Sequence, residues 1–126
     1  MTRQAVSSEQ APAALGPYSQ AIVAGGFVFC SGTAGIDPAT GVAADGIEAQ
    51  TEQALRNLAA ILEEAGSSLD RVVKTTVFLT DLGTFAAMNE VYARHVGDAP
   101  PARSTVEVSA LPSGALVEIE AVALTT

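Results

Sequence analysis

The feature that most constrains the fold of this chain is a run of 27 residues, from Gln10 to Ile36, that contains no charged side chain. The run is longer than the ~20 apolar residues that a transmembrane helix needs. It is interrupted by residues that suit turns and strands and do not suit a lipid-facing helix. These residues are Pro12, Gly16, Pro17, Ser19, Gln20, Gly25, Gly26, Ser31 and Gly32. We therefore expect soluble β structure here and no membrane span.

A β-hairpin is predicted inside this run. Apolar segments at 20–24 and 27–30 flank the Gly-Gly pair at 25–26, which can adopt the positive φ angles of a tight turn. We expect the second strand to end at 31–32. Segment 37–41 reads Asp-Pro-Ala-Thr-Gly, which predicts a second tight turn.

Two amphipathic helices are predicted farther along the chain. Over 47–65, apolar positions recur at intervals of three and four residues, and Gly66 follows where a left-handed cap belongs. The charges off that stripe, including Glu52 and Arg56 in the favourable i,i+4 order, are most simply a solvated face. The second helix is predicted over 82–96 with a cap at Thr80 or Asp81. Its buried stripe is expected to contain Leu82, Phe85, Met88, Val91, Tyr92 and Val96.

The remaining segments predict strands. Segment 72–79 is β-branched and aromatic, as in an interior strand, and strands at 102–109 and 115–124 are joined by a proline and glycine turn. The predicted order is ββαβαββ in one domain over 1–126, an α+β fold with a mixed β-sheet and two helices packed on one face. The other face would stay partly apolar, so we expect the chain to form an oligomer.

Composition excludes several classes of function. Six basic and 14 acidic side chains give a net charge of −8, which disfavours nucleic-acid binding and anionic membranes. One cysteine and one histidine exclude an intramolecular disulfide and a Cys/His zinc site. The first 11 residues contain no apolar run typical of a secretion signal, so we expect a cytoplasmic protein.

Arg103 is the first candidate for chemistry. It enters a strand directly after the segment Pro100-Pro101-Ala102, and alternation places it on one face with Thr105 and Glu107. A guanidinium there can hold a substrate carboxylate through two parallel hydrogen bonds. A salt bridge to a partner strand or subunit is the alternative, and residue chemistry alone favours it.

Carboxylates in the last strand are the second candidate. Glu118 and Glu120 share a face with Leu116, Val122 and Leu124. Burial among such neighbours would raise a carboxyl pKa toward the range useful for acid–base catalysis. An exposed or interfacial strand face is the simpler interpretation of any single glutamate.

Four further positions are candidates for lining a site. Tyr18 can cap a pocket with its hydroxyl, Ser31 and Gly32 can bring backbone groups close to a ligand, and Asn89 stands one turn after an apolar helix position. Ordinary packing, a turn and a solvated amide are the alternatives for these residues.

Two reactive residue types have structural interpretations. Cys30 lies on an apolar strand with no base assignable near it, so it is predicted to be a small core residue. His95 is predicted to interact with the dipole at the C-terminal end of the second helix. Neither is expected to act chemically.

Several segments taken together resemble a known family. They are 16–21 (Gly-Pro-Tyr-Ser-Gln-Ala), 31–32, 37–41, 89–92 (Asn-Glu-Val-Tyr), 100–106 (Pro-Pro-Ala-Arg-Ser-Thr-Val), and 111–112 with 117–120. This pattern closely resembles the Rid/YjgF family of imine deaminases from about residue 12 to 124, and the segment around Arg103 is its most specific part. The resemblance implies a chorismate-mutase-like fold, a homotrimer, and sites in clefts between subunits.

The resemblance also implies roles for individual residues. The residue matching Arg103 binds the carboxylate of a 2-imino or 2-enamino acid, and the one matching Glu118 positions or activates water. Residues matching Tyr18, Ser31, Gly32, Asn89 and Thr105 line the same cleft. Water would add to the C=N bond, and the resulting carbinolamine would expel ammonia to leave a 2-oxo acid, with no metal or cofactor.

Two departures from the family pattern affect what can be carried over. The motif that commonly reads Ser-Gly-Gln-Ile-Pro continues here after Ser31-Gly32 as Thr33-Ala34-Gly35-Ile36, which changes the wall beside the site. Many members have a cysteine where Thr105 stands, so a thiol role is absent. A ligand-binding or chaperone-like (holdase) role is the second hypothesis, and RNA cleavage is the third because no basic stripe is present.

Overall fold

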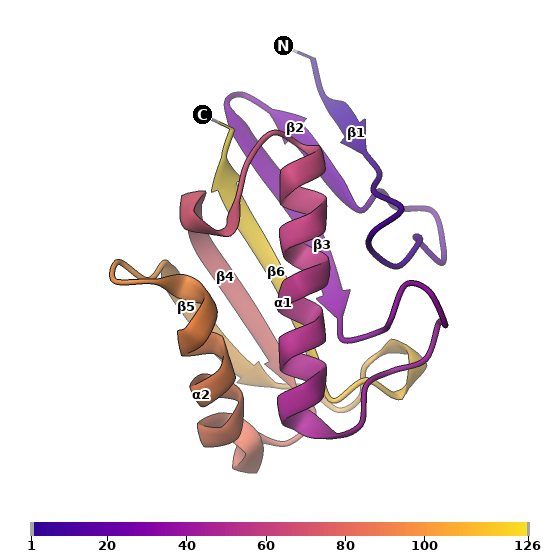
Figure 1. Cartoon of the computed structure of the whole chain (residues 1–126), viewed down its shortest axis with the longest axis vertical. Helices are drawn as coiled ribbons and strands as arrows, with labels where there is room; N and C mark the ends of the chain where they lie inside the picture. The colour runs from indigo at the N-terminus through magenta and orange to yellow at the C-terminus, as the bar shows by residue number, and fades with distance from the viewer. Residues whose placement is uncertain (1, 126) are drawn as a thin grey trace.

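One six-stranded sheet with both helices on the same face organises the computed structural model, which describes residues 2–125 (Figure 1). The elements in chain order are β1 (Gln4–Val6), β2 (Ala21–Ala24), β3 (Phe27–Ala34), α1 (Gly46–Glu64), β4 (Val72–Leu79), α2 (Phe85–Val96), β5 (Ala102–Glu107) and β6 (Val117–Leu124). The predicted ββαβαββ order is confirmed, with β1 added at the N-terminus. Three residues are too few to produce a recognisable strand pattern.

The strand order is β1-β2-β3-β6-β4-β5. All neighbouring pairs are antiparallel except β4 with β5, which are parallel. A parallel pair needs a crossover of helical length, and α2 provides it between β4 and β5. The sheet is therefore mixed, as predicted, and its segment 72–79 is an interior strand.

The hydrophobic core lies between α1 and the sheet. Leu55, Leu58 and Leu62 of α1 are fully buried against strand residues such as Val28 and Ile119. Periodicity predicted this helix within one residue at each end, and Gly66 follows it with a φ of +80°. In the described part of the chain, neither helix is both long enough and apolar enough to cross a membrane.

The sheet face without helices stays open. In β6, Val117, Ile119, Ala121 and Ala123 are buried under the helices, whereas Glu118, Glu120, Val122 and Leu124 face the other way. Large apolar side chains, including Phe29 and Val106, are exposed on this open face. The expectation of one uncovered face is confirmed; the homotrimer stays a prediction.

The hairpin forms as predicted, but its second strand is longer than expected. Gly25 and Gly26 have φ angles of +59° and +84°, those of a primed turn. The prediction that the strand ends at Ser31-Gly32 is wrong, because β3 continues to Ala34 through a register shift. From Cys30 to Thr33, β3 advances three residues while its partner β6 advances two, so β3 contains one extra residue, a β-bulge.

The second helix is shorter than its apolar pattern. Leu82 lies in a 3-10 turn over Leu82–Thr84 and is exposed, and Phe85, the first residue of α2, is also exposed, so both depart from the predicted buried stripe. Asp81 caps this turn by accepting a 2.8 Å hydrogen bond from the Gly83 N–H. Strand β5 ends at Glu107, earlier than the predicted 109, and β6 begins at Val117, later than the predicted 115. A 3-10 turn at Pro112–Gly114 lies between them.

Candidate functional site

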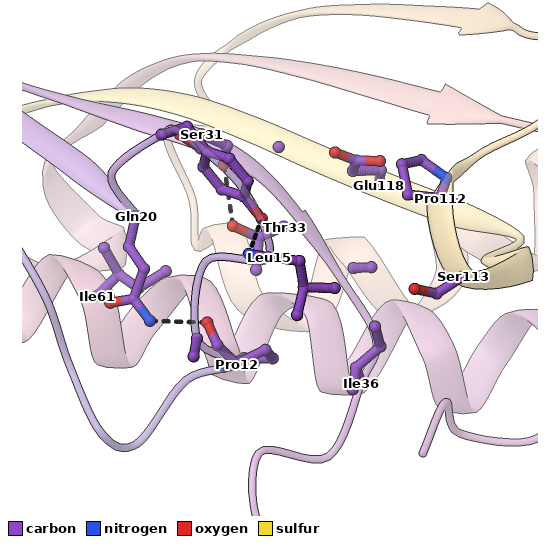
Figure 2. Close-up of a pocket in the computed structure, with 14 residues that line it drawn as sticks. Pro12, Leu15, Gln20, Ser31, Thr33, Ile36, Ile61, Pro112, Ser113 and Glu118 are labelled. Carbon is purple, nitrogen blue, oxygen red and sulfur yellow. Dashed lines mark hydrogen bonds between the residues drawn. The ribbon is translucent and has the colours of Figure 1, made fainter. Parts of the chain in front are cut away.

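A pocket opens at the end of β3, where β2 no longer pairs with it (Figure 2). The loop before β2, the β3 bulge and the 3-10 turn before β6 form its walls. Of the predicted site residues, it brings together Tyr18, Ser31, Gly32 and Glu118. We call these four residues the carboxylate pocket.

Buried polar contacts hold the loop that walls this pocket. Gln20 donates to the Pro12 carbonyl over 2.7 Å, and its side-chain oxygen accepts from the Ser8 N–H over 2.6 Å. The Ser31 hydroxyl donates to the Ser19 carbonyl over 2.6 Å. Sequence reasoning missed Gln20, because nothing in a single sequence distinguishes a buried glutamine from an exposed one. Such satisfied buried groups fix backbone position.

Glu118 is the ionisable group of the carboxylate pocket. Its backbone lies between Ala34 of β3 and Phe78 of β4, and its side chain is half-buried. Burial raises the pKa of this carboxyl, and the neighbouring carboxylate of Glu120 raises it further. The predicted direction of the shift is confirmed, and it favours proton exchange nearer neutral pH.

Gly32 lies directly against this carboxyl. A Cβ atom at Gly32 would overlap the Glu118 Oε1 atom. The β3 bulge thus brings backbone without a side chain up to the carboxyl group, and any larger residue must displace it.

Arg103 occupies a different place, at the sheet edge formed by β5. Its backbone pairs with Thr75 of β4, and its guanidinium carbon lies 4.8 Å from the ring centre of Tyr92 and 5.5 Å from that of Phe85. No carboxylate within residues 2–125 lies at salt-bridge distance from Arg103. A half-buried arginine is ordinarily paired. Within residues 2–125 the Arg103 guanidinium has no acidic partner, so its donors can bind an anion.

Two further predicted residues belong to β5 and α2, the strand that holds Arg103 and the helix that contacts it. Thr105 follows it on the same strand face, and the buried Thr105 hydroxyl has no hydrogen-bond partner within residues 2–125. Asn89 is half-buried on α2, four residues after Phe85 and three before Tyr92, which places it on the same helix face. We call Asn89, Arg103 and Thr105 the arginine edge.

The carboxylate pocket and the arginine edge do not meet within one chain. Arg103 lies on the helix-covered face, because its partner Thr75 hydrogen-bonds Tyr92 of α2. Glu118 lies on the open face, because it alternates with the buried residues Val117 and Ile119. The predicted shared cleft therefore requires a second copy of the chain.

The remaining candidates have structural surroundings. Cys30 is buried, and burial raises the pKa of its thiol to about 12, which confirms a core role. The His95 Nε2 atom lies 2.9 Å from a carboxylate oxygen of Glu52 on α1, so it joins the two helices as well as lying near a helix end. Sequence reasoning did not single out Lys74, which lines a hollow on the open face with Glu120.

Comparisons with known proteins show which proteins share this sequence and fold. The family model described as Endoribonuclease L-PSP matches residues 8–125. The chain is 44% identical to the mouse 2-iminobutanoate/2-iminopropanoate deaminase, over 97% of this chain and 91% of the mouse protein. Among solved structures, RidA from the Antarctic bacterium Psychrobacter sp. is 47% identical with a TM-score of 0.94, covering 96% of this chain and 98% of that one. E. coli TdcF with bound serine is 38% identical with a TM-score of 0.93, covering 98% and 99%.

Proposed function

The chain belongs to the Rid/YjgF family, and from this premise we propose that it hydrolyses 2-imino and 2-enamino acids to 2-oxo acids and ammonia. Relatives named as imine deaminases, and one named as a reactive intermediate deaminase, support this reaction. Serine, the ligand named with TdcF, has the carboxylate and the α-nitrogen that such a substrate also has. The proposed enzyme is a homotrimer with its sites between subunits.

The observation that carries the proposal is that each half of the site lacks its electrostatic complement. The arginine edge has a half-buried cation without an acidic partner in residues 2–125, and the carboxylate pocket has a half-buried acid without a basic one. Packing the open face of one copy against a neighbour's edge would bring the two together. A substrate carboxylate would then bind Arg103 while its imine carbon faces Glu118.

The proposed chemistry uses these two groups and water. Glu118 accepts a proton from water as the water oxygen attacks the imine carbon, which gives a carbinolamine. The protonated carboxyl gives this proton to nitrogen, and Glu118 then transfers the hydroxyl proton of the carbinolamine to the same nitrogen, so that the C–N bond breaks and ammonia leaves as the C=O bond forms. A carboxyl with a raised pKa suits both transfers. Asn89, Thr105, Tyr18 and Ser31 are proposed to line the cleft.

Mixing two inactive variants tests this arrangement. Arg103→Ala and Glu118→Gln chains would be unfolded together, refolded at equal ratio, and supplied with imines by an amino-acid oxidase or dehydratase. If each site takes Arg103 from one copy and Glu118 from its neighbour, random assembly restores about one quarter of the sites, since each group is intact with a probability of about one half.

The controls are each variant refolded alone and a chain carrying both substitutions mixed with the single variants. A mixture no more active than the separate variants contradicts a shared site. Light scattering on the same samples tests the trimer, and a monomer at micromolar concentration would contradict it.

A holdase role is the second candidate, and the open face favours it. Phe29 is 46% exposed and Val106 is 42% exposed on a face that could bind unfolded chains. If this face is buried in an assembly, it is not available. The test measures how well the assembled protein suppresses citrate synthase aggregation, at the same molar concentrations at which its imine hydrolysis is assayed. Suppression at those concentrations would favour the holdase.

A further inference from the structure

We infer that Phe85 and Tyr92 are positioning residues that hold the Arg103 guanidinium in the orientation that receives a substrate carboxylate. This inference rests on the proposed function for the identity of the anion. Both rings come from α2, and both lie within cation–π distance of the same guanidinium, at 5.5 and 4.8 Å. Within residues 2–125 the Arg103 guanidinium forms no salt bridge, so these two rings are its only cation–π or ion-pair partners there.

The spacing along α2 explains how one helix supplies both rings. Phe85 and Tyr92 are seven residues apart, so they lie two turns apart on one helix face. Strand β5 runs beside β4 at the sheet edge, and its register places Arg103 at Thr75. The arginine side chain thus extends from the sheet edge to the face of α2.

Tyr92 is itself held in place. Its hydroxyl lies 2.7 Å from the Thr75 hydroxyl, and both side chains are buried. A buried hydroxyl pair of this kind fixes a ring, because rotating either group would leave the other unsatisfied. A chain of contacts therefore runs from β4 through Tyr92 to Arg103.

Aromatic rings suit this task better than a carboxylate does. An acidic partner would occupy the planar fork of N–H donors that a ligand carboxylate needs. Ring faces instead contact the guanidinium through its π surface and leave its edge donors free. The rings also limit the rotamers of a long side chain, so less entropy is lost when the ligand binds.

The first test is ligand binding without turnover. The full-length assembled protein is titrated with 2-oxobutanoate, and the Nε–H signal of Arg103 is followed by NMR. Phe85→Leu suits this test because Phe85 is 38% exposed and its replacement leaves the core intact. We expect affinity to fall roughly 2- to 30-fold and the Nε–H proton signal to move downfield as ring shielding is lost.

Tyr92→Leu and Tyr92→Phe separate the ring from the hydroxyl. The leucine variant should weaken binding at least as much as Phe85→Leu does, whereas the phenylalanine variant, which keeps the ring, should weaken it less. Met88→Leu is the matched control, since Met88 is fully buried on the same helix and has no aromatic ring to offer the guanidinium. It should bind as the wild type does.

A double-variant cycle gives the deciding result. In the Arg103→Ala background, Phe85→Leu should cause no further loss of 2-oxobutanoate binding, because the ring acts through the arginine. An equal loss in both backgrounds, or unchanged binding in Phe85→Leu with imine hydrolysis intact, overturns the inference alone. Binding that depends on Arg103 and Phe85 in a protein without hydrolysis overturns the proposed deaminase and keeps the inference.

Discussion

The arginine edge and the carboxylate pocket handle buried charge in opposite ways. At the edge, a cation contacts two aromatic rings, and no carboxylate within residues 2–125 lies at salt-bridge distance from it. In the pocket, an acid is destabilised in its charged form by burial and by Glu120, and the backbone of Gly32 lies against it. One region holds a permanent charge, and the other holds a carboxyl group whose pKa its surroundings raise.

This difference fits the division of labour proposed for the two groups. A carboxylate anchor must stay charged at all pH values, which an arginine does. A proton-transfer group must change its charge near neutral pH, which a carboxyl does only when its surroundings raise its pKa. The two regions also lie on opposite sheet faces, so their proposed cooperation depends on assembly.

The largest expected effect concerns which carboxylate acts. Glu118→Gln keeps the shape of the side chain but removes the base, so imine hydrolysis should fall by about 10²–10⁴-fold while 2-oxobutanoate binding survives. Glu120→Gln is the control on the same face, and it should affect stability or assembly more than turnover. Equal losses in both variants, measured with identical imine supply, would show that Glu118 is not the proton-transfer group.

The arginine edge should depend on geometry as well as charge. Arg103→Ala should lower kcat/KM about 10²–10³-fold, and Arg103→Lys at least about tenfold, because an ammonium ion cannot form two parallel hydrogen bonds to a carboxylate. Circular dichroism should show that both variants keep the fold. Wild-type kinetics in Arg103→Lys would mean that the substrate carboxylate is held elsewhere.

Gly32→Ala should disturb the pocket and leave the edge intact. The added methyl group displaces the carboxyl group at the flexible end of the Glu118 side chain, so we expect turnover to fall about tenfold with little change in stability. Gly16→Ala is the control, because its Cβ would make ordinary contacts of 3.9 Å with the Tyr18 ring. Arg103-dependent binding of 2-oxobutanoate should remain in both variants; its loss in Gly32→Ala would mean that the two regions are not independent.

The smallest effect is on stability and measures the contact between the two regions. The Glu118 pKa is raised above its unfolded value of 4.5, so its ionised form destabilises the fold above that pH and costs nothing below it. In the Arg103→Ala background, Glu118→Gln should therefore stabilise the protein at neutral pH, by less than about 1 kcal/mol, and lose this advantage as the pH falls toward 4.5.

With Arg103 present, a neighbouring copy would supply a cation and remove this advantage. The comparison of melting temperatures in the two backgrounds at pH 7 is the measurement. Identical effects of Glu118→Gln with and without Arg103 would show that the two groups are not close in the assembled protein.

Local patterns predicted the elements well because their signals are short-range. The three- and four-residue apolar spacing identified α1, and the Gly-Gly pair at 25–26 identified the hairpin. Alternation correctly placed Glu118 with Glu120 and Arg103 with Thr105. Each of these predictions depends only on residues that are close together in the sequence, within one or two helical turns or within one strand.

Features that depend on distant contacts were not visible in the same way. The bulge at Ser31-Gly32 arises from the register of β3 against β6, which are far apart in the chain. The stacking of Phe85 and Tyr92 on Arg103 depends on how α2 crosses the sheet, and an apolar stripe looks the same whether it covers a core or a cation.

Residue order alone settles which side chains share a strand face, since alternation is a property of the extended backbone. It does not settle which face the helices cover, because the crossover connections and the strand order β1-β2-β3-β6-β4-β5 come from long-range pairing. Through that pairing, Arg103 lies under α2 and Glu118 on the open face. The same two side chains, each placed correctly within its own strand, thereby became two separate halves of a candidate site.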